Sequence, residues 1–338
     1  MSSCYPLRFA PLFRRYLWGG RRLESHLGKA IGEGDDYAES WEIVDRRSDQ
    51  STVQFGPLAG QTLHELAARD PESFYGSSSP PPRSFPLLFK FLDAHQTLSV
   101  QVHPTDLEAA KLNPPDLGKT EAWVILHAEP GSKIYAGLKS GVDSEMLRTA
   151  VKQGMVADCL HQFEPVAGDC VFIPAGTVHA LGAGLIVAEI QQASDTTYRL
   201  FDWNRVGADG KPRPLHIEES IKAIHFELGA VDPQAPRPTG NRCIERLVEC
   251  DKFVLDRCRT SAAIHIGGDN RFHLLVNLGD AILIEGDPAG RPLHRGEVAL
   301  LPAALGATAV TPERDAEFLD IYLPSTVAIG TAFQHRQG

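Results

Sequence analysis

The chain has 338 residues, of which 43% are hydrophobic and 22% are charged, and its formal net charge is −10. A chain of this length can form two domains, and this composition is typical of a folded globular protein rather than a disordered one. The negative charge disfavours non-specific binding to nucleic acid or to an anionic membrane, so an anionic substrate requires a local cluster of lysine and arginine side chains.

The N-terminal stretch and the cysteines both favour a cytoplasmic location. Prolines and arginines interrupt residues 1–20, which therefore lack the continuous apolar segment of a signal peptide. No apolar run approaches the length needed to cross a bilayer. The six cysteines include no CxxC pair, so we expect reduced thiols. We expect a cytoplasmic protein with neither a membrane nor a nucleic-acid partner.

Short apolar runs separated by glycine, proline, aspartate and asparagine dominate the chain, and they predict β-strands. In chain order these runs cover residues 87–92, 98–102, 122–126, 171–173, 185–190, 253–255, 273–277, 281–284, 298–301 and 318–323. Helical patterns occur at residues 61–69, 143–153 and 217–224, and segments rich in proline, glycine or serine predict surface loops at 75–85 and 232–240. The whole pattern predicts an all-β sandwich or barrel with a few short helices.

One eight-residue pattern occurs twice in the chain. GDCVFIPA at residues 168–175 returns as GEVALLPA at residues 296–303. Both copies predict a buried strand that follows a turn glycine and ends at a proline. We therefore expect two related β-modules, a catalytic domain at residues 1–235 and a degenerate domain at residues 241–338, which lacks the histidine that follows the first copy.

Polar residues occupy unusual places around the first copy. Ser99, Gln101 and His103 alternate along the predicted strand LSVQVHP and therefore share one face. A polar row of this kind is unusual inside a small barrel unless something polar fills the middle. His179 follows a proline–glycine break, which holds the backbone in a turn and therefore aims the side chain.

Together these segments supply a set of metal donors. His103 and His179 offer imidazoles, Glu121 offers a carboxylate, and Gln101 offers an amide oxygen. Nitrogen and oxygen donors without a thiolate suit zinc, with a position left open for substrate or water. Two histidines and one carboxylate also match the facial triad of non-heme iron oxygenases, so the donors alone do not choose the metal.

Several motifs resemble a known family. G-x5-P-x-G-x2-H at residues 168–179 matches the second signature of the cupin superfamily, whereas the first signature is altered to Gln-Val-His at 101–103, with its glutamate at Glu121. Six segments carry a second resemblance: FPLLFKFLDAHQTLSVQVHP, GKTEAWVIL, AEIQQASDTTYRL, KPRPLHIEESIKAI, WGG and ESWE. In these segments the chain also resembles type I mannose-6-phosphate isomerases of the short bacterial form. The resemblance covers about residues 5–224. It implies two cupin-type jelly-roll modules, the second without metal ligands.

The resemblance also implies a site. One zinc ion per chain would be held by Gln101, His103, Glu121 and His179. The remaining pocket residues would be catalytic, at Arg199, Lys119 and Glu189, or would bind substrate, at Lys90, Ser99 and Asp195.

The activity implied is that of a zinc-dependent aldose–ketose isomerase, which interconverts mannose 6-phosphate and fructose 6-phosphate through an enediolate. Zinc would stabilise negative charge, a base would move a proton between C1 and C2, and cationic side chains would hold the phosphate. Glu189, Lys119 and a zinc-bound water are all candidates for the base. The expected partner is a phosphorylated hexose, and the short loops and second module are compatible with a monomer.

Two other functions are compatible with the donors. An iron-dependent cupin oxygenase would use the same His-Glu-His set, although it leaves the lysines and the arginine without a shared purpose. A non-catalytic phosphosugar-binding cupin would bind the sugar without turnover. Two residues also have structural alternatives, because Asp195 can shape a turn and Arg199 can pair with Asp202.

Overall fold

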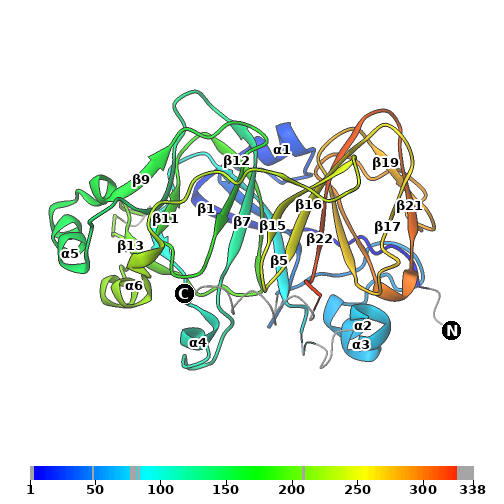
Figure 1. Ribbon diagram of the computed structural model, residues 1–338, viewed down its shortest axis with the longest axis horizontal. Coiled ribbons are helices and arrows are strands. Elements are labelled where there is room, and N and C mark those ends of the chain that lie inside the picture. The colour runs from blue at the N-terminus through cyan, green and yellow to red at the C-terminus, as the bar shows by residue number, and fades with distance from the viewer. Residues whose placement is uncertain (1–3, 48, 77–81, 83, 208–209, 326–338) are drawn as a thin grey trace. The chain divides into compact units, whose positions relative to one another are not determined.

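The computed structural model describes residues 4–47, 49–76, 82, 84–207 and 210–325, and it consists mainly of β-strands with few helices (Figure 1). The all-β fold predicted from the sequence is therefore confirmed. The chain divides into two compact units. The first comprises Leu12–Trp41 and Leu87–Gln234, and the second comprises the described residues up to Pro11, Glu42–Pro86 and the described residues from Ala235 onward.

The units divide last between Gln234 and Ala235, and two N-terminal segments, the described residues up to Pro11 and Glu42–Pro86, belong to the second unit. Leu7 and Leu300 exchange backbone hydrogen bonds of 2.8 Å in both directions. The rings of Phe85 and Phe272 lie 4.9 Å apart. Contacts between segments so far apart in the chain cannot be predicted from the local residue pattern. Of the predicted loop at 75–85, residues 77–81 and 83 lie outside the described residues.

Two sheets form the first unit. The larger has the strand order β1 (Leu12–Gly20), β2 (Tyr37–Ile43), β5 (Leu87–Ala94), β12 (Leu185–Gln192), β7 (Glu121–Ala128) and β10 (Cys170–Ile173). The smaller has the order β13 (Tyr198–Phe201), β6 (Val100–Val102), β11 (His179–Leu181), β8 (Ile134–Leu138) and β9 (Leu160–Phe163). One buried apolar cluster takes side chains from both sheets, among them Trp123 and Leu181. The two sheets therefore enclose a common core, as in a β-sandwich.

Strand β5 contains a charged residue within a buried, apolar run. All eight of its residues are buried, as expected for a strand with a partner on each side. Lys90 lies in the middle of this apolar run and is only 7% exposed. The antiparallel register sets Lys90 opposite Glu189 of β12. Strand pairing alone therefore brings a buried cation and a buried carboxylate to neighbouring positions.

The predicted helices are confirmed as α2, α5 and α6. In the described residues the α-helices are α1 (Arg22–Leu27), α2 (Leu63–Arg69), α3 (Pro71–Tyr75), α4 (Asp106–Ala109), α5 (Ser144–Gln153) and α6 (Ile217–Ala223), with 3-10 turns at Val156–Cys159, Phe226–Leu228 and Ala303–Leu305. Asp143 caps α5 by accepting hydrogen bonds from two backbone N–H groups, and Gly154 ends the helix in the left-handed conformation. No helix among the described residues is long and apolar enough to span a membrane.

The second unit repeats the same plan. Its larger sheet has the order β14 (Arg237–Pro238), β15 (Ile244–Glu249), β16 (Val254–Thr260), β22 (Ala316–Tyr322), β18 (His273–Asn277) and β20 (Val298–Leu301). A smaller sheet has the order β17 (Ile264–Ile266), β21 (Thr308–Pro312) and β19 (Ile282–Ile284), and β3 (Asp45–Arg46) pairs with β4 (Asp49–Gln50). The two copies of the repeated motif form β10 and β20, and each is the last strand of its six-stranded sheet.

Corresponding strands of the two units carry different buried charges. β18 lies beside β20 as β7 lies beside β10, and His273 stands opposite Leu301 just as Glu121 stands opposite Ile173. His273 Nδ1 lies 2.8 Å from Asp320 Oδ1, and its Nε2 lies 3.1 Å from Asp269 Oδ1. At this position the second unit has a histidine that is paired on both ring nitrogens.

This pairing predicts that the second unit loses stability in alkaline solution. Burial alone would lower the pKa of His273, but the carboxylates of Asp320 and Asp269 outweigh it and raise the pKa to about 10. Because the folded state holds the proton more tightly, the stabilisation is complete below about pH 6.5 and is lost as the pH rises through 10. We expect the free energy of unfolding to fall by about 2–4 kcal/mol over this range.

Urea unfolding of His273→Gln at several pH values tests this expectation, because its stability should change less between pH 6.5 and 10 than that of the wild type. His294→Gln, which changes an exposed histidine, is the matched control and should keep the wild-type dependence. Equal pH dependence in His273→Gln and the wild type would contradict the assignment.

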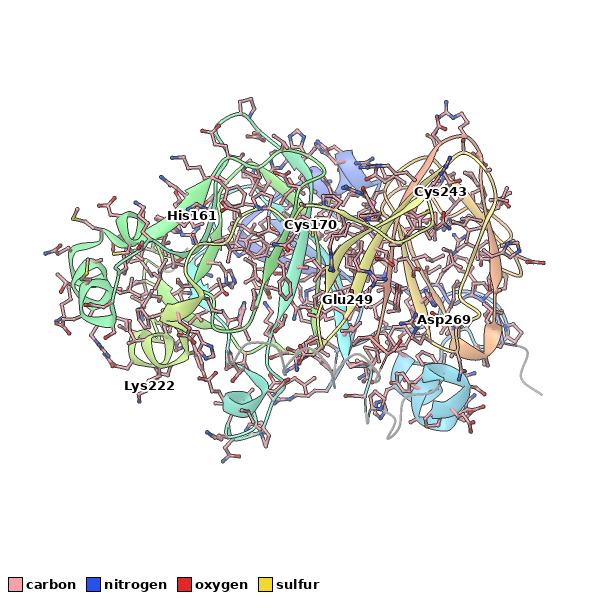
Figure 2. The ribbon with its side chains drawn as sticks, in the orientation of Figure 1. His161, Cys170, Lys222, Cys243, Glu249 and Asp269 are labelled. Carbon is pink, nitrogen blue, oxygen red and sulfur yellow. The ribbon has the colours of Figure 1, made fainter. Side chains whose placement is uncertain are left out.

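None of the six cysteines, all of which lie in the described residues, forms a disulfide, in agreement with the expectation of reduced cysteines. Figure 2 marks two of them, Cys170 in β10 and Cys243 just before β15. Cys159, Cys170 and Cys258 are buried. They therefore act as small apolar side chains in their cores.

Candidate active site

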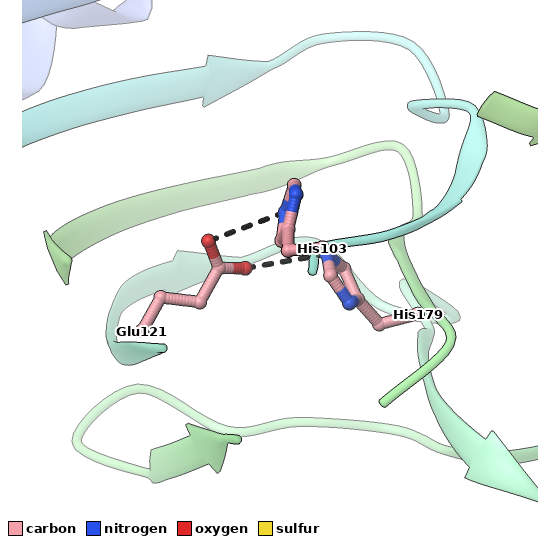
Figure 3. Close-up of side chains that lie close together, drawn as sticks. All are labelled: His103, Glu121 and His179. Carbon is pink, nitrogen blue, oxygen red and sulfur yellow. Dashed lines mark ion pairs between the residues drawn. The ribbon is translucent and has the colours of Figure 1, made fainter. Parts of the chain in front are cut away.

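Three predicted metal donors meet in the first unit. His103, Glu121 and His179 each offer a ligand atom, and these atoms all lie within 4.8 Å of one another. His179 Nε2 lies 3.2 Å from Glu121 Oε1, and His103 Nε2 lies 3.5 Å from Glu121 Oε2 (Figure 3). Each of the three residues is only 1% exposed. His103 and His179 are 76 residues apart in the chain, yet all three donors face a common point.

The strands explain this convergence. His179 begins β11, and its backbone pairs with Gln101 of β6. The turn before His179 contains Gly176 at φ +88, where a Cβ would meet the ring of His225 at 2.7 Å. The N–H of Gly176 donates a 2.9 Å hydrogen bond to the carbonyl of His103. The proline–glycine turn is therefore fastened directly to the backbone of the other histidine.

Backbone carbonyls set the tautomers of both histidines. His103 Nδ1 lies 3.0 Å from the carbonyl of Thr196, and His179 Nδ1 lies 2.9 Å from that of Thr177. Because a carbonyl only accepts, each Nδ1 carries the proton and each Nε2 presents a lone pair toward Glu121. Burial lowers the pKa of both imidazoles, that of His179 to about 4. Both rings are neutral at neutral pH, as metal ligation requires.

Gln101 lies at the same point. Its Nε2 is 3.3 Å from His179 Nε2. Rotating the amide by half a turn places Oε1 there instead, and an oxygen is the atom that would bind a cation. With this oxygen the four side chains provide two nitrogens and two kinds of oxygen, which fits a divalent ion such as zinc.

A row of alternating charges borders the donors. Lys119 Nζ lies 2.8 Å from Glu121 Oε2 and 3.7 Å from Glu189 Oε1. Lys90 Nζ lies 3.4 Å from both Glu189 Oε1 and Glu39 Oε1. Burial raises the pKa of Glu189, whereas the pKa of Lys90 is raised because Glu189 and Glu39 outweigh the effect of its own burial. These charges stabilise one another because the side chains are buried.

These side chains line a cavity of about 290 Å³. All the site residues predicted from the sequence line it except His103, namely Gln101, Glu121, His179, Lys90, Lys119, Glu189, Ser99, Asp195 and Arg199. His103 lies beside the cavity, in contact with Lys119 at 3.1 Å. The predicted residues are therefore brought together, although proximity alone leaves their roles as proposals.

Other residues of the cavity were not predicted. Tyr16 and Trp18 of β1 line it and stack on one another, with ring centroids 5.6 Å apart. Glu39 of β2 and Arg213 also line it. Trp18 and Glu39 belong to the WGG and ESWE motifs. Because β1 and β2 show too little apolar alternation to be predicted as strands, the sequence did not indicate that these two residues line the cavity.

Arg199 is not the partner of Asp202, which was one structural alternative. Asp202 is bound by Arg205 and Arg213 instead. Arg199 Nη1 donates to the carbonyl of Pro214 at 3.0 Å, and its Nε is buried without a hydrogen-bond partner in the described part of the chain. Arg199 therefore keeps one buried donor, Nε, without a partner in the described residues, and its side chain lines the cavity.

Comparison with known proteins agrees with this geometry. Residues 7–119 match the family described as phosphomannose isomerase type I, catalytic domain. The chain is 35% identical over 309 residues to the mannose-6-phosphate isomerase ManA of Bacillus subtilis (strain 168), which covers 89% of this chain and 94% of that protein. It is 38% identical over 219 residues to the mannose-6-phosphate isomerase of Streptococcus mutans, covering 65% of this chain and 67% of that one.

The fold is also similar to solved structures. The crystal structure of the mannose 6-phosphate isomerase from Bacillus subtilis superposes with a TM-score of 0.85 at 27% identity, covering 95% of this chain and 100% of that chain. A mannosephosphate isomerase structure from Archaeoglobus fulgidus, described as putative, has a TM-score of 0.74 at 23% identity and is similar in fold.

Proposed function

The chain is an enzyme of the type I phosphomannose isomerase family, and we propose that it interconverts mannose 6-phosphate and fructose 6-phosphate with one bound zinc ion. The observation that carries the proposal is the convergence of His103, Glu121 and His179 beside a cavity lined with buried lysine, glutamate and arginine side chains. An aldose–ketose isomerase needs both parts, a cation near the reacting oxygens and a group that moves a proton.

The proposed zinc ligands are Gln101, His103, Glu121 and His179. Both imidazoles are neutral and are oriented by backbone carbonyls, which suits ligation through Nε2. When bound, the zinc ion supplies Lewis-acid stabilisation of the negative charge that develops on the sugar oxygens.

We assign the proton transfer to Glu189. The forward reaction removes the proton on C2 of the open-chain aldose and returns a proton to C1, while the C1 carbonyl becomes a hydroxyl and the C2 hydroxyl becomes a carbonyl. Burial raises the pKa of Glu189 above its ordinary value, which makes its carboxylate a stronger base for removing a proton from carbon. Glu189 takes the C2 proton to form the enediolate and then returns a proton to C1, while the Lys119 ammonium gives a proton to O1 and takes back the proton from O2.

The two lysines flank this carboxylate and have different contacts. Lys119 lies between Glu189 and Glu121, so its ammonium is placed to donate hydrogen bonds to the enediolate oxygens. Lys90 lies between Glu189 and Glu39, and its charge is already compensated. The sequence suggested that Lys90 anchors the phosphate, but its contacts favour a role in holding Glu189 in place.

The substrate phosphate is assigned to Arg199. Its unpartnered Nε supports this assignment, as does its place on the cavity wall together with Ser99. A guanidinium suits a phosphate because its donors match two phosphate oxygens at once. Binding energy from the phosphate then orients the distant C1 and C2 carbons for reaction.

An iron-dependent oxygenase would draw on the same three donors. It gives no role to Lys119, Lys90 or Arg199, although burying such charges is costly unless they serve a purpose. The isomerase accounts for these residues together with the donors, and it is therefore the function that we propose.

Removal of the metal tests the proposal. We expect a chelator to lower isomerase activity by about 10²- to 10⁴-fold, because the Lewis acid contributes several kcal/mol to the barrier. Added zinc should restore the activity, as measured in a coupled assay alongside elemental analysis. Protein dialysed without chelator is the control. Full activity in metal-free protein would contradict the proposal, and restoration by iron but not zinc would contradict the choice of metal.

A further inference from the structure

One end of the cavity carries an excess of positive charge. Asp202, which is 5% exposed, accepts hydrogen bonds from Arg213 Nε at 2.8 Å and Nη2 at 2.6 Å, and from Arg205 Nη2 at 2.5 Å. Arg199 belongs to the same cluster, since burial and the neighbouring charge of Arg213 lower its pKa. Two guanidinium groups therefore share one carboxylate, and with the neighbouring Arg199 the cluster has about two more positive than negative charges.

Two of the three arginines face the cavity. Arg199 and Arg213 line it, whereas Arg205 bonds to Asp202 and to the carbonyl of Thr97. The lysines of the same cavity, Lys90 and Lys119, are each paired with carboxylates. Four acidic and four basic side chains line the cavity, but in the described residues neither Arg199 nor Arg213 forms an ion pair with another lining residue, so the positive charge at this end comes from these two arginines.

Backbone contacts hold the two arginines side by side. The N–H of His216 donates to the carbonyl of Arg199 at 2.8 Å, and the N–H of Arg199 donates to His216 Nδ1 at 3.1 Å. Arg199 Nη1 also donates to the carbonyl of Pro214, the residue that follows Arg213. These bonds hold the segment that contains Arg213 next to β13, and Asp202 binds the guanidinium group of Arg213. A pre-arranged cation of this kind binds an anion with little loss of side-chain entropy.

We propose that Arg213 is a second phosphate ligand and determines the specificity of the site for phosphorylated over free sugars, with Asp202 as its positioning residue. A phosphate monoester carries between 1.5 and 2 negative charges at neutral pH, which matches the excess on the arginine cluster. Arg199 and Arg213 then hold the phosphate from two sides, while Asp202 and Arg205 keep Arg213 in place. The inference rests on the proposed function, because it takes the ligand to be the phosphate of that substrate.

Steady-state kinetics and calorimetry on Arg213→Gln and Arg213→Lys test the proposal. We expect Arg213→Gln to raise KM for mannose 6-phosphate by about 10- to 100-fold, the loss of one charge-assisted hydrogen-bonded contact, with kcat within a few-fold of wild type. The inhibition constant of inorganic phosphate should rise in parallel, and Arg213→Lys should recover part of both. The fold is expected to survive, because Asp202 keeps Arg205 as a partner.

Arg148→Gln is the control, since Arg148 also pairs with a carboxylate, Glu218, but lies outside the cavity. It should leave KM and phosphate inhibition unchanged. Wild-type KM and phosphate inhibition in Arg213→Gln would overturn the inference, and so would a loss confined to kcat and thermal stability. A wild-type protein that binds mannose 6-phosphate in calorimetry without isomerising it would overturn the proposed function instead, and the binding comparison would still decide the role of Arg213.

Discussion

Replacement of His179 by alanine is expected to remove the bound zinc and to lower isomerase activity by about 10²- to 10⁴-fold. His179 supplies one of two imidazoles, and its Nε2 lies 3.2 Å from Glu121 Oε1 at the centre of the donor cluster. Without it, one nitrogen donor is lost and the carboxylate faces a gap. Elemental analysis and the coupled assay on the same preparation measure both effects.

The matched control is His161→Ala. His161, labelled in Figure 2, lies in β9, pairs with Asp232 at 2.8 Å and does not line the cavity. This variant should keep the wild-type zinc content and activity. The second unit has its own core, built around Phe318 and Leu275, so His179→Ala should also keep most of its secondary structure. A full equivalent of zinc in active His179→Ala protein would refute the proposed metal site.

Replacement of Glu189 by glutamine is expected to lower kcat by about 10²- to 10⁴-fold, the range typical of general acid–base residues. The substitution keeps the shape of the side chain but removes its ability to carry a proton. KM and zinc content should stay close to wild type, because Glu189 is not among the proposed ligands and Lys90 retains Glu39 as a partner. Steady-state kinetics with metal analysis distinguish these outcomes.

Glu218→Gln provides the same chemical change outside the cavity, at a residue paired with Arg148, and it should leave kcat unchanged. Wild-type kcat in Glu189→Gln would show that another group moves the proton. Lys119 is the next candidate, since its Nζ lies near both Glu189 and Glu121. Loss of kcat in Lys119→Gln, together with normal kcat in Glu189→Gln, would transfer the role to that lysine.

Local pattern was enough to predict much of the fold. The run LLFKFL became β5, with all eight residues buried, because a continuous apolar run suits a strand that is covered on both faces. Helix α5 was predicted from the helical residue pattern at 143–153. Strands β1 and β2 were missed, because arginines in β1 and glutamates in β2 interrupt the alternation that marks a half-buried strand.

The sequence by itself determined the donor set of the candidate metal site and the repeated motif that ends both large sheets. These features depend on residue type and close spacing, which strand geometry converts directly into position. Only the tertiary structure decided that Glu39 stands beside Lys90, that Asp202 holds Arg213 rather than Arg199, and that the N-terminal segments belong to the second unit. Each of these contacts joins residues that are distant in the chain or depends on the direction of a long side chain. Neither distance through space nor side-chain direction is encoded in a local pattern.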